Sequence, residues 1–219
     1  MSVTEVVEAD QVKFHLPFSL IISGASTSGK TSLLLKILEN NRQLITPEPA
    51  EIVYCYTEYQ DHVPRLELMG VKCHPNAPDD ALIDGLKKPA LLVMDDCMNV
   101  VSERFLTDLL TRKVHHRQLG AIFVTQSLFE KNLRVARSNA HYIILTRAPS
   151  AQLSIRSLGY QLFPNQLPYF LDAYKLAAEG VPYGYLLITL HPAIDSRLRL
   201  RTNIMPGEVQ IVFIPKHVQ

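Results

Sequence analysis

The sequence predicts a doubly wound α/β fold, in which helices cover both faces of a mostly parallel sheet. Apolar runs alternate with segments of helical period along most of the chain, which is the pattern of repeated strand and helix units. The runs at residues 17–23 and 90–96 are apolar almost throughout, as strands covered on both faces should be. We therefore expect one α/β domain over residues 14–207, preceded by a polar tail at 1–13 and followed by an edge strand and tail at 208–219.

The composition is that of a globular chain and excludes several classes of protein. The 219 residues carry 22 basic and 21 acidic side chains, so a polybasic surface is excluded and nucleic-acid contacts must be confined to a local basic groove or ring. Three cysteines without C-x-x-C spacing disfavour a disulfide framework or a structural zinc site. The apolar runs fall short of the ~18 residues of a membrane span, and the N-terminus lacks signal-peptide features. We expect a soluble intracellular or intraviral protein without a membrane partner.

The remaining elements are expected in chain order. Ser102 should cap a helix that carries leucines inward and basic residues toward its C-terminus. Residues 59–86 contain several prolines and glycines, so short surface helices are expected there. Further strands are expected at 51–57, 121–126, 141–147, 184–190, 198–203 and 209–215, and further helices at 30–40, 150–160 and 165–179.

A phosphate-binding motif lies between the first predicted strand and the helix at 30–40. The segment 24–31, GASTSGKT, matches G-x-x-x-x-G-K-[ST] without deviation. Its glycines let successive N–H groups curl around phosphates, and the helix N-terminus adds the positive end of a dipole. Lys30 is expected to neutralise the β- and γ-phosphates during catalysis and Thr31 to bind Mg²⁺, so ATP and Mg²⁺ are the expected cofactors. The predicted nucleotide-binding residues are Gly24, Ala25, Ser26, Thr27, Ser28, Gly29, Lys30, Thr31 and Ser32.

Two aspartates follow the apolar run that begins at residue 90. In α/β proteins the carboxyl ends of the strands form the ligand-binding edge, so Asp95 and Asp96 are expected there. Asp95 is the predicted Mg²⁺ ligand. Asp96 is the candidate general base, because an ATPase must orient and deprotonate the attacking water. The alternative is that both carboxylates cap the following helix.

The strand at 121–126 ends in a polar pair, Thr125-Gln126, after four apolar residues. An amide at that strand end could reach the attacking water or the γ-phosphate, so Gln126 is a candidate catalytic residue. The alternative is a polar residue that only opens the next loop.

These motifs together resemble the FtsK/HerA superfamily of DNA-pumping ATPases, which have the ASCE type of P-loop fold. The segment 116–126, HRQLGAIFVTQ, looks like the superfamily segment in which an arginine, a turn with glycine and an apolar strand lead to a sensor Gln. The resemblance implies that Arg117 is an arginine finger, supplied to the ATP of a neighbouring subunit. Considered alone, Arg117 could equally be a surface charge at a helix end. One departure is Asp96, where cellular FtsK and HerA proteins usually have Glu.

Four shorter segments look like the viral genome-packaging ATPases. They are TQSLF at 125–129, SNAHYIIL at 138–145, GYLLI at 184–188 and LRLRTNI at 198–204. The enzymes of Maverick/Polinton elements and adintoviruses resemble them most, and the poxvirus-like enzymes are more distant. The resemblance implies a hexameric or pentameric homo-oligomeric ring that threads double-stranded DNA into a capsid, with a capsid vertex or portal protein as partner. It places the chain at the site of virion assembly, in the host nucleus or cytoplasm or with the virion.

Basic residues in two segments are candidates for DNA contact, mainly to phosphates because a packaging motor must run over any sequence. The second set alternates and is therefore expected on one face of a strand. For both sets the alternative is solvated surface charge. The first set is Lys131, Arg134 and Arg137, and the second is Arg197, Arg199 and Arg201.

Three other functions fit parts of the pattern. A nucleotide or nucleoside kinase would use the same P-loop, but Asp96 and Thr125-Gln126 argue against it. An ATP-dependent capsid scaffold without hydrolysis would not need Lys30, Asp95 and Asp96 intact. An FtsK/HerA-like DNA translocase that acts outside packaging would share every motif.

Overall fold

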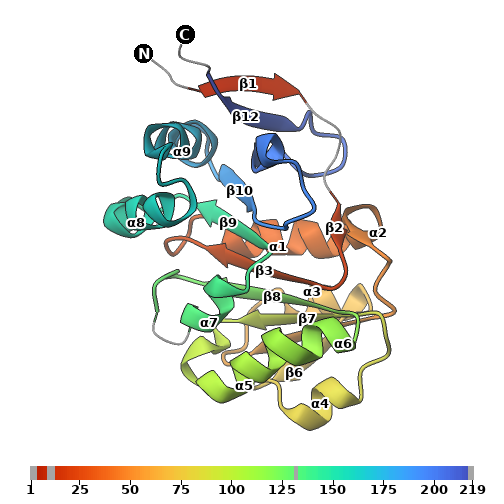
Figure 1. The fold of residues 1–219 in the computed structure, drawn as a ribbon. Helices are drawn as coiled ribbons and strands as arrows, with labels where there is room; N and C mark the ends of the chain where they lie inside the picture. Colours follow the sequence, from red (N-terminus) through yellow and green to blue (C-terminus); the bar gives the residue numbers. More distant parts are fainter. Residues whose placement is uncertain (1–3, 9–12, 131–132, 217–219) are drawn as a thin grey trace.

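A single large sheet organises the computed structural model, which describes residues 4–8, 13–130 and 133–216. Across the described chain ten strands form this sheet, in the order β1-β12-β11-β10-β9-β3-β8-β7-β5-β6 (Figure 1). The strands are β1 Thr4–Glu8, β3 Phe18–Ser23, β5 Glu51–Tyr56, β6 Lys72–Pro75, β7 Ala90–Asp95, β8 Leu119–Thr125, β9 Tyr142–Thr146, β10 Tyr185–Thr189, β11 Leu200–Thr202 and β12 Ile211–Pro215. A second, small sheet pairs β2 Phe14–His15 with β4 Ile45–Thr46.

The sheet has a parallel part and an antiparallel part. From β9 to β6 all neighbouring strands are parallel, as the alternation of strands and helices predicts. Beyond β9, the strands β10, β11, β12 and β1 pair antiparallel. Short connections join β10 to β11 and β11 to β12, as antiparallel pairing allows. The predicted α/β fold with a mostly parallel central sheet is confirmed.

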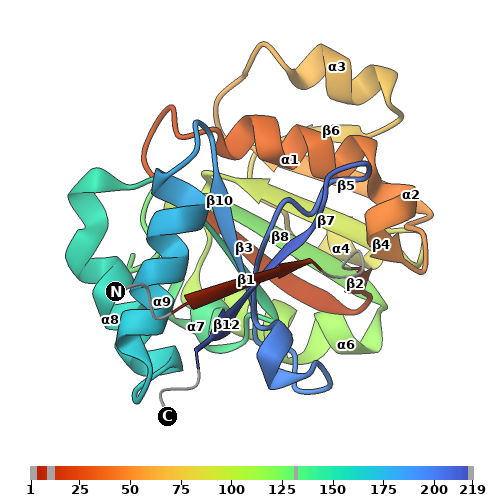
Figure 2. The same cartoon turned by 90° about the horizontal axis from the view of Figure 1, so that it is seen from above.

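Helices cover both faces of the sheet, as Figure 2 shows from above. Side chains alternate along each central strand, so Leu20 and Ile22 pack on one face and Ile21 on the other. Within the described ranges, no helix combines the length and apolar composition that a bilayer crossing requires. The first face carries α1 Lys30–Glu39, α2 Asn41–Leu44 and α3 Val63–Leu68; the second carries α4 Asp80–Asp84, α5 Glu103–Asp108, α6 Val114–His116, α7 Leu133–Ser138, α8 Gln152–Leu162 and α9 Leu167–Tyr174.

Several elements differ from the expectation. The irregular segment 59–86 contains the expected short helices but also β6, which pairs parallel to β5 and ends at Pro75. A proline is tolerated there because β6 is an edge strand. The predicted helices after Ser102 and at 165–179 each continue into a π-helical turn, Leu109–Lys113 and Lys175–Glu179. The cap itself is confirmed, since Ser102 Oγ accepts a hydrogen bond from Phe105 N at 3.2 Å.

The N-terminal segment is more than the tail expected at 1–13. Residues Thr4–Glu8 form β1, which pairs antiparallel with β12, with Val6 opposite Phe213. The expected edge strand at 209–215 therefore has a neighbour on each side, β11 and β1. The sequence TEVVE is short and rich in β-branched residues, which suits a strand at the end of a sheet.

Candidate active site

The residues predicted to bind and hydrolyse a nucleotide meet at one edge of the sheet. β3, β8 and β7 are parallel neighbours, so their carboxyl ends lie together, at the left in Figure 1. β3 leads into the P-loop at 24–29, β7 ends at Asp95, and β8 ends one residue before Gln126. Because β8 lies between β3 and β7, Gln126 emerges between the P-loop and the two aspartates.

Glycine is required at both ends of the P-loop for different reasons. A Cβ on Gly24 would lie 1.8 Å from Oγ1 of Thr146 at the end of β9, so no larger residue fits there. Gly29 has a φ of +93°, a left-handed conformation that favours glycine, directly before α1. Ala25 N donates to the carbonyl of Arg147 at 3.3 Å, which ties the loop to the end of β9.

Lys30 points back into the P-loop. The residue is 8% exposed, and its Nζ donates to the carbonyls of Gly24 at 2.9 Å and Ala25 at 2.8 Å. Burial lowers the pKa of Lys30, while the negative charges of Asp96 and Asp95 oppose that shift. Both hydrogen-bond acceptors belong to the loop backbone, so phosphate oxygens entering the loop could replace them.

Asp95 is buried and oriented by a tyrosine that the sequence analysis did not single out. The Tyr54 hydroxyl donates to Oδ2 of Asp95 at 2.5 Å and lies 2.8 Å from Nε2 of His62. Burial raises the pKa of Asp95, and the hydrogen bond from Tyr54 opposes that shift. The carboxylate therefore has one defined orientation at the end of β7.

Asp96 adopts a left-handed conformation with φ +48°, and its N–H donates to the carbonyl of Val124 at 3.2 Å. Its side chain is exposed and makes no capping hydrogen bond to the 3₁₀ turn Cys97–Asn99 that follows. Helix capping therefore does not account for this carboxylate. The residues around it enclose a cavity of about 400 Å³, lined by Thr57, Glu58, Gln60, Asp96, Asn99, Thr125, Gln126 and Glu130.

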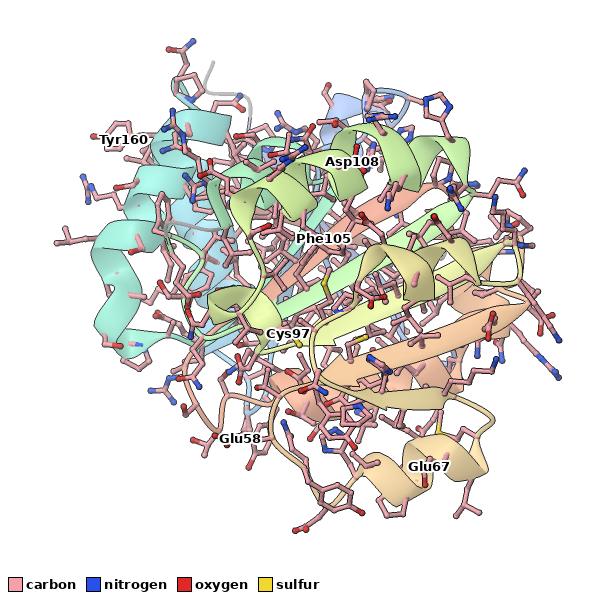
Figure 3. The ribbon with its side chains drawn as sticks, turned by 90° about the horizontal axis from the view of Figure 1, so that it is seen from below. Glu58, Glu67, Cys97, Phe105, Asp108 and Tyr160 are labelled. Atoms are coloured by element: carbon pink, nitrogen blue, oxygen red, sulfur yellow. The ribbon has the colours of Figure 1, made fainter. Side chains whose placement is uncertain are left out.

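Two more carboxylates of this cavity were missed by the sequence analysis. Glu58 lies beyond the end of β5, and Figure 3 shows it toward the same edge of the sheet as Cys97. Glu130 lies in the loop after β8, where its Oε1 accepts from Oγ1 of the buried Thr125 at 3.2 Å. The position of Glu58 directly after an apolar run was the available signal. Together with Asp96 these residues make the cavity acidic.

Gln126 contacts the P-loop directly. Its Oε1 accepts a hydrogen bond from the hydroxyl of Ser26 at 3.1 Å. The side chain also lines the cavity that contains Asp96. Gln126 therefore bridges the loop and the carboxylates, and does more than open the next loop.

Arg117 lies at the opposite edge of the sheet from the P-loop. It follows α6 and precedes β8, at the right in Figure 1. The seven residues of β8 separate it from the catalytic edge by about 20 Å. Its guanidinium pairs with Asp84 Oδ1 at 2.8 Å. Arg117 therefore does not reach the nucleotide site of its own chain. Two roles remain for it: an arginine finger for a neighbouring subunit, or a surface charge.

The first set of predicted DNA contacts is partly exposed. Lys131 lies outside the described residues. Arg134 is exposed on α7, whereas the guanidinium of Arg137 lies 4.3 Å from the ring centre of Phe129 and donates to the carbonyl of Leu128 at 3.0 Å.

The second set does not lie on one strand face, so that expectation is wrong. Asp195 caps a 3₁₀ turn, Ser196–Leu198, and pairs with Arg197 at 2.7 Å, so β11 begins only at Leu200. Arg199 lies 4.4 Å from the ring centre of Phe163. Arg201 is 6% exposed and donates to Gln210 Oε1 at 2.8 Å, so its guanidinium is engaged inside the sheet rather than presented at the surface.

Comparisons with known proteins find similar solved structures. The genome-packaging NTPase B204 of Sulfolobus turreted icosahedral virus 2, in complex with ATPγS, aligns over 80% of this chain and 93% of its own, with a TM-score of 0.56 and 13% identity. B204 of Sulfolobus turreted icosahedral virus, described as the DNA-packaging ATPase, aligns over 93% and 100%, with a TM-score of 0.57 and 10% identity. The AMPPCP complex of the former has a TM-score of 0.55. No protein-family model and no curated protein matches the chain.

The likeness extends over most of both chains and concerns the fold alone, since the sequences are only 10–13% identical. The chain has the fold of these viral packaging enzymes, which agrees with the resemblance found in the sequence. The finer resemblance to the Maverick/Polinton and adintovirus enzymes stays a prediction.

Proposed function

We propose that the chain is an ATP-hydrolysing motor that moves double-stranded viral DNA into a capsid. The observation that carries the proposal is the convergence of Lys30, Asp95, Asp96 and Gln126 around the P-loop at one sheet edge. The fold shared with B204, whose structures contain ATP analogues, supports both the ligand and the process.

ATP binds with its phosphates in the P-loop. The loop amides and the N-terminus of α1 face the phosphates, and Lys30 exchanges its carbonyl partners for phosphate oxygens. Thr31 and Asp95 would hold Mg²⁺, which supplies charge neutralisation on the phosphates when bound. One hydroxyl and one oriented carboxylate fit an ion that completes its shell with phosphate and water. The described residues contain no cluster of three His, Cys, Asp or Glu side chains that would form an all-protein site.

Hydrolysis uses the exposed carboxylate of Asp96. Asp96 accepts a proton from water as the water oxygen bonds to the γ-phosphorus and the bond to the ADP oxygen breaks. Gln126 lines the same cavity and orients this water, while its hydrogen bond from Ser26 couples the state of the P-loop to the end of β8. The negative charge that develops on the phosphate oxygens in the transition state needs a further cation. Arg117 of a neighbouring subunit in a ring supplies this cation.

The acidic cavity distinguishes this proposal from a kinase. Among the described residues, its lining contains Glu58, Asp96 and Glu130 and no lysine or arginine. Such a pocket repels the phosphate of a nucleotide acceptor and so argues against a nucleotide kinase, whereas it accommodates water and a cation from a neighbouring subunit.

The proposed function also implies the binding partners of the chain. The ring is a hexamer or a pentamer, contacts DNA phosphates through Arg134 and Lys131, and docks on a capsid vertex or portal protein at the site of virion assembly. Arg137 is a weaker candidate because its guanidinium already contacts Phe129.

The decisive experiment measures ATP hydrolysis with and without double-stranded DNA. We expect DNA to stimulate the wild type, Lys30→Ala and Arg117→Ala each to be inactive, and an equimolar mixture of the two variants to regain activity. Recovery requires that Arg117 of one chain serves the intact P-loop of another. Arg112→Ala is the matched control, since Arg112 is an exposed arginine paired with Asp108 and should leave the rate unchanged.

Two outcomes would contradict the proposal at different points. If the equimolar mixture of the two variants stays inactive, Arg117 does not act on the nucleotide of a neighbouring subunit. If DNA of any length leaves the rate of hydrolysis unchanged, the chain is not a DNA motor. It would then be an ATPase whose hydrolysis drives another process.

A further inference from the structure

An exposed tyrosine lies against the P-loop, on the side away from the catalytic carboxylates. Tyr183 is 75% exposed, although it belongs to a turn between two well-packed elements. A Cβ built on Gly29 would lie 3.0 Å from Cδ1 and 3.2 Å from Cβ of Tyr183. The tyrosine therefore touches the loop immediately before Lys30, while most of its surface faces solvent.

The backbone around Tyr183 is held in a conformation that is unusual for a bulky residue. Its φ is +55°, in the left-handed region that large side chains rarely adopt. Gly184 N donates to the carbonyl of Val181 at 3.0 Å, and a Cβ on Gly184 would lie 2.2 Å from the carbonyl of Ala177. The turn is thus pressed against the π-helical turn Lys175–Glu179, which fixes the position of Tyr183. Strained residues that the surroundings hold in place cluster at ligand sites.

The strand order separates the two ends of the phosphate site. The order β10-β9-β3-β8-β7 places the P-loop, after β3, in the middle. Asp96 and Gln126 follow β7 and β8 on one side, whereas Tyr183 precedes β10 on the other. A nucleotide with its γ-phosphate at the carboxylates consequently directs its nucleoside toward β9 and β10.

We propose that Tyr183 is the stacking platform for the nucleobase of the bound triphosphate. This inference rests on the proposed function and adds to it the residue that holds the base. An aromatic ring offers a flat apolar surface to the face of a base, and such stacking depends little on which base is present. Tyr183 therefore contributes to the binding of ATP and GTP alike, and contributes nothing to the binding of inorganic triphosphate.

The test is equilibrium binding of ATP, GTP and inorganic triphosphate to the full chain, in the presence of Mg²⁺. Tyr183→Ala and Tyr183→Gly are expected to weaken ATP and GTP about tenfold and to leave inorganic triphosphate unchanged. Glycine adopts a positive φ freely, so Tyr183→Gly keeps the turn where alanine strains it. Tyr183→Phe retains the ring and should bind like the wild type. Tyr160→Ala is the matched control, because Tyr160 is exposed near the end of α8 (Figure 3).

Three results would overturn the inference. Unchanged affinity for ATP in both truncated variants removes the stacking role. An equal loss for ATP and inorganic triphosphate shows that the tyrosine shapes the phosphate loop instead. A wild type that binds none of the three ligands refutes the proposed function, and the inference with it.

Discussion

The P-loop edge and the antiparallel end of the sheet each contain a buried cation, but the surroundings of these two cations differ. Lys30 is 8% exposed and Arg201 is 6% exposed. Lys30 donates to carbonyls of a partly exposed loop at the end of parallel strands. Arg201 donates to the carbonyl of Leu198 at 2.9 Å and to the amide oxygen of Gln210, a side chain that is itself buried. A buried cation in a ligand-sized loop can change partners, whereas one between paired strands is part of the structure.

The largest effect should come from Lys30. Lys30→Met is expected to lower the rate of ATP hydrolysis by about 10²–10³-fold, because the phosphates lose a charge that acts in a water-poor site. The free energy of unfolding should stay unchanged or rise slightly, since the variant no longer buries an ammonium group. Steady-state hydrolysis and thermal melts measure the two quantities.

The matched control for Lys30 is Lys36→Met, on the exposed face of the same helix α1. It should change neither the rate nor the melting midpoint. A Lys30→Met protein that melts well below the wild type would show that this cation, too, is structural.

The second effect is on stability and comes from Arg201. Arg201→Met is expected to reduce the free energy of unfolding by about 3 kcal/mol, because the buried oxygen of Gln210 loses its charged donor. Affinity for double-stranded DNA should be unchanged in the folded fraction. Arg197→Met, at the exposed pair with Asp195, is the control and should melt like the wild type. Lost DNA affinity with a wild-type midpoint would restore Arg201 as a DNA contact.

The difference between the parallel and the antiparallel part of the sheet also explains what could be predicted from the sequence. In the parallel part, strands are continuous apolar runs, and the P-loop, the two aspartates and Gln126 each follow the run that positions them. Arg117 is the exception, because it precedes its strand. The P-loop, Asp95, Asp96 and Gln126 were therefore placed correctly at one edge, and their chemical roles stay predictions. In the antiparallel part, the alternating arginines suggested one exposed strand face. The Asp195 turn shortens β11, and burial of Arg201 could not be seen in a local pattern.

The sequence also could not predict contacts between residues that are far apart in the chain. Tyr54 meets Asp95 across 41 positions of the sequence, because β5 and β7 are neighbours and end at the same edge. Tyr183 meets Gly29 because the turn before β10 lies beside the P-loop. Neither tyrosine belongs to a motif, and each becomes visible only when the strand order is known. β1 and β6 were missed for the same reason, since a short edge strand is defined by its neighbour.

The third effect concerns the orientation of Asp95. Tyr54→Phe removes one hydroxyl from a side chain with no exposed surface and should weaken Mg²⁺-dependent ATP binding about tenfold, the usual scale for a residue that orients a metal ligand. Binding of ATP without Mg²⁺ should stay unchanged, which separates orientation of the carboxylate from a general loss of structure. Titrations of ATP with and without Mg²⁺ measure the difference.

Tyr56→Phe is the matched control, because Tyr56 stacks on Tyr54 from the same strand and should leave both affinities unchanged. If Tyr54→Phe weakens both affinities equally, the hydroxyl supports the loop rather than the metal ligand.

The smallest effect is a gain in stability when Asp95 becomes Asn. Burial raises the pKa of Asp95 in the folded chain, so the ionised carboxylate opposes folding once the pH exceeds the ordinary aspartate range near 4. Below that range both states bind the proton and the cost is absent; it grows as the pH rises toward the raised folded pKa and is constant above it. The midpoint of Asp95→Asn should therefore exceed that of the wild type more at about pH 8 than at about pH 4. The exposed control Asp61→Asn should show no such trend. An Asp95→Asn protein that melts lower at about pH 8 would mean that the hydrogen bond from Tyr54 outweighs the cost of burial, and that the charged carboxylate stabilises the fold of the empty site.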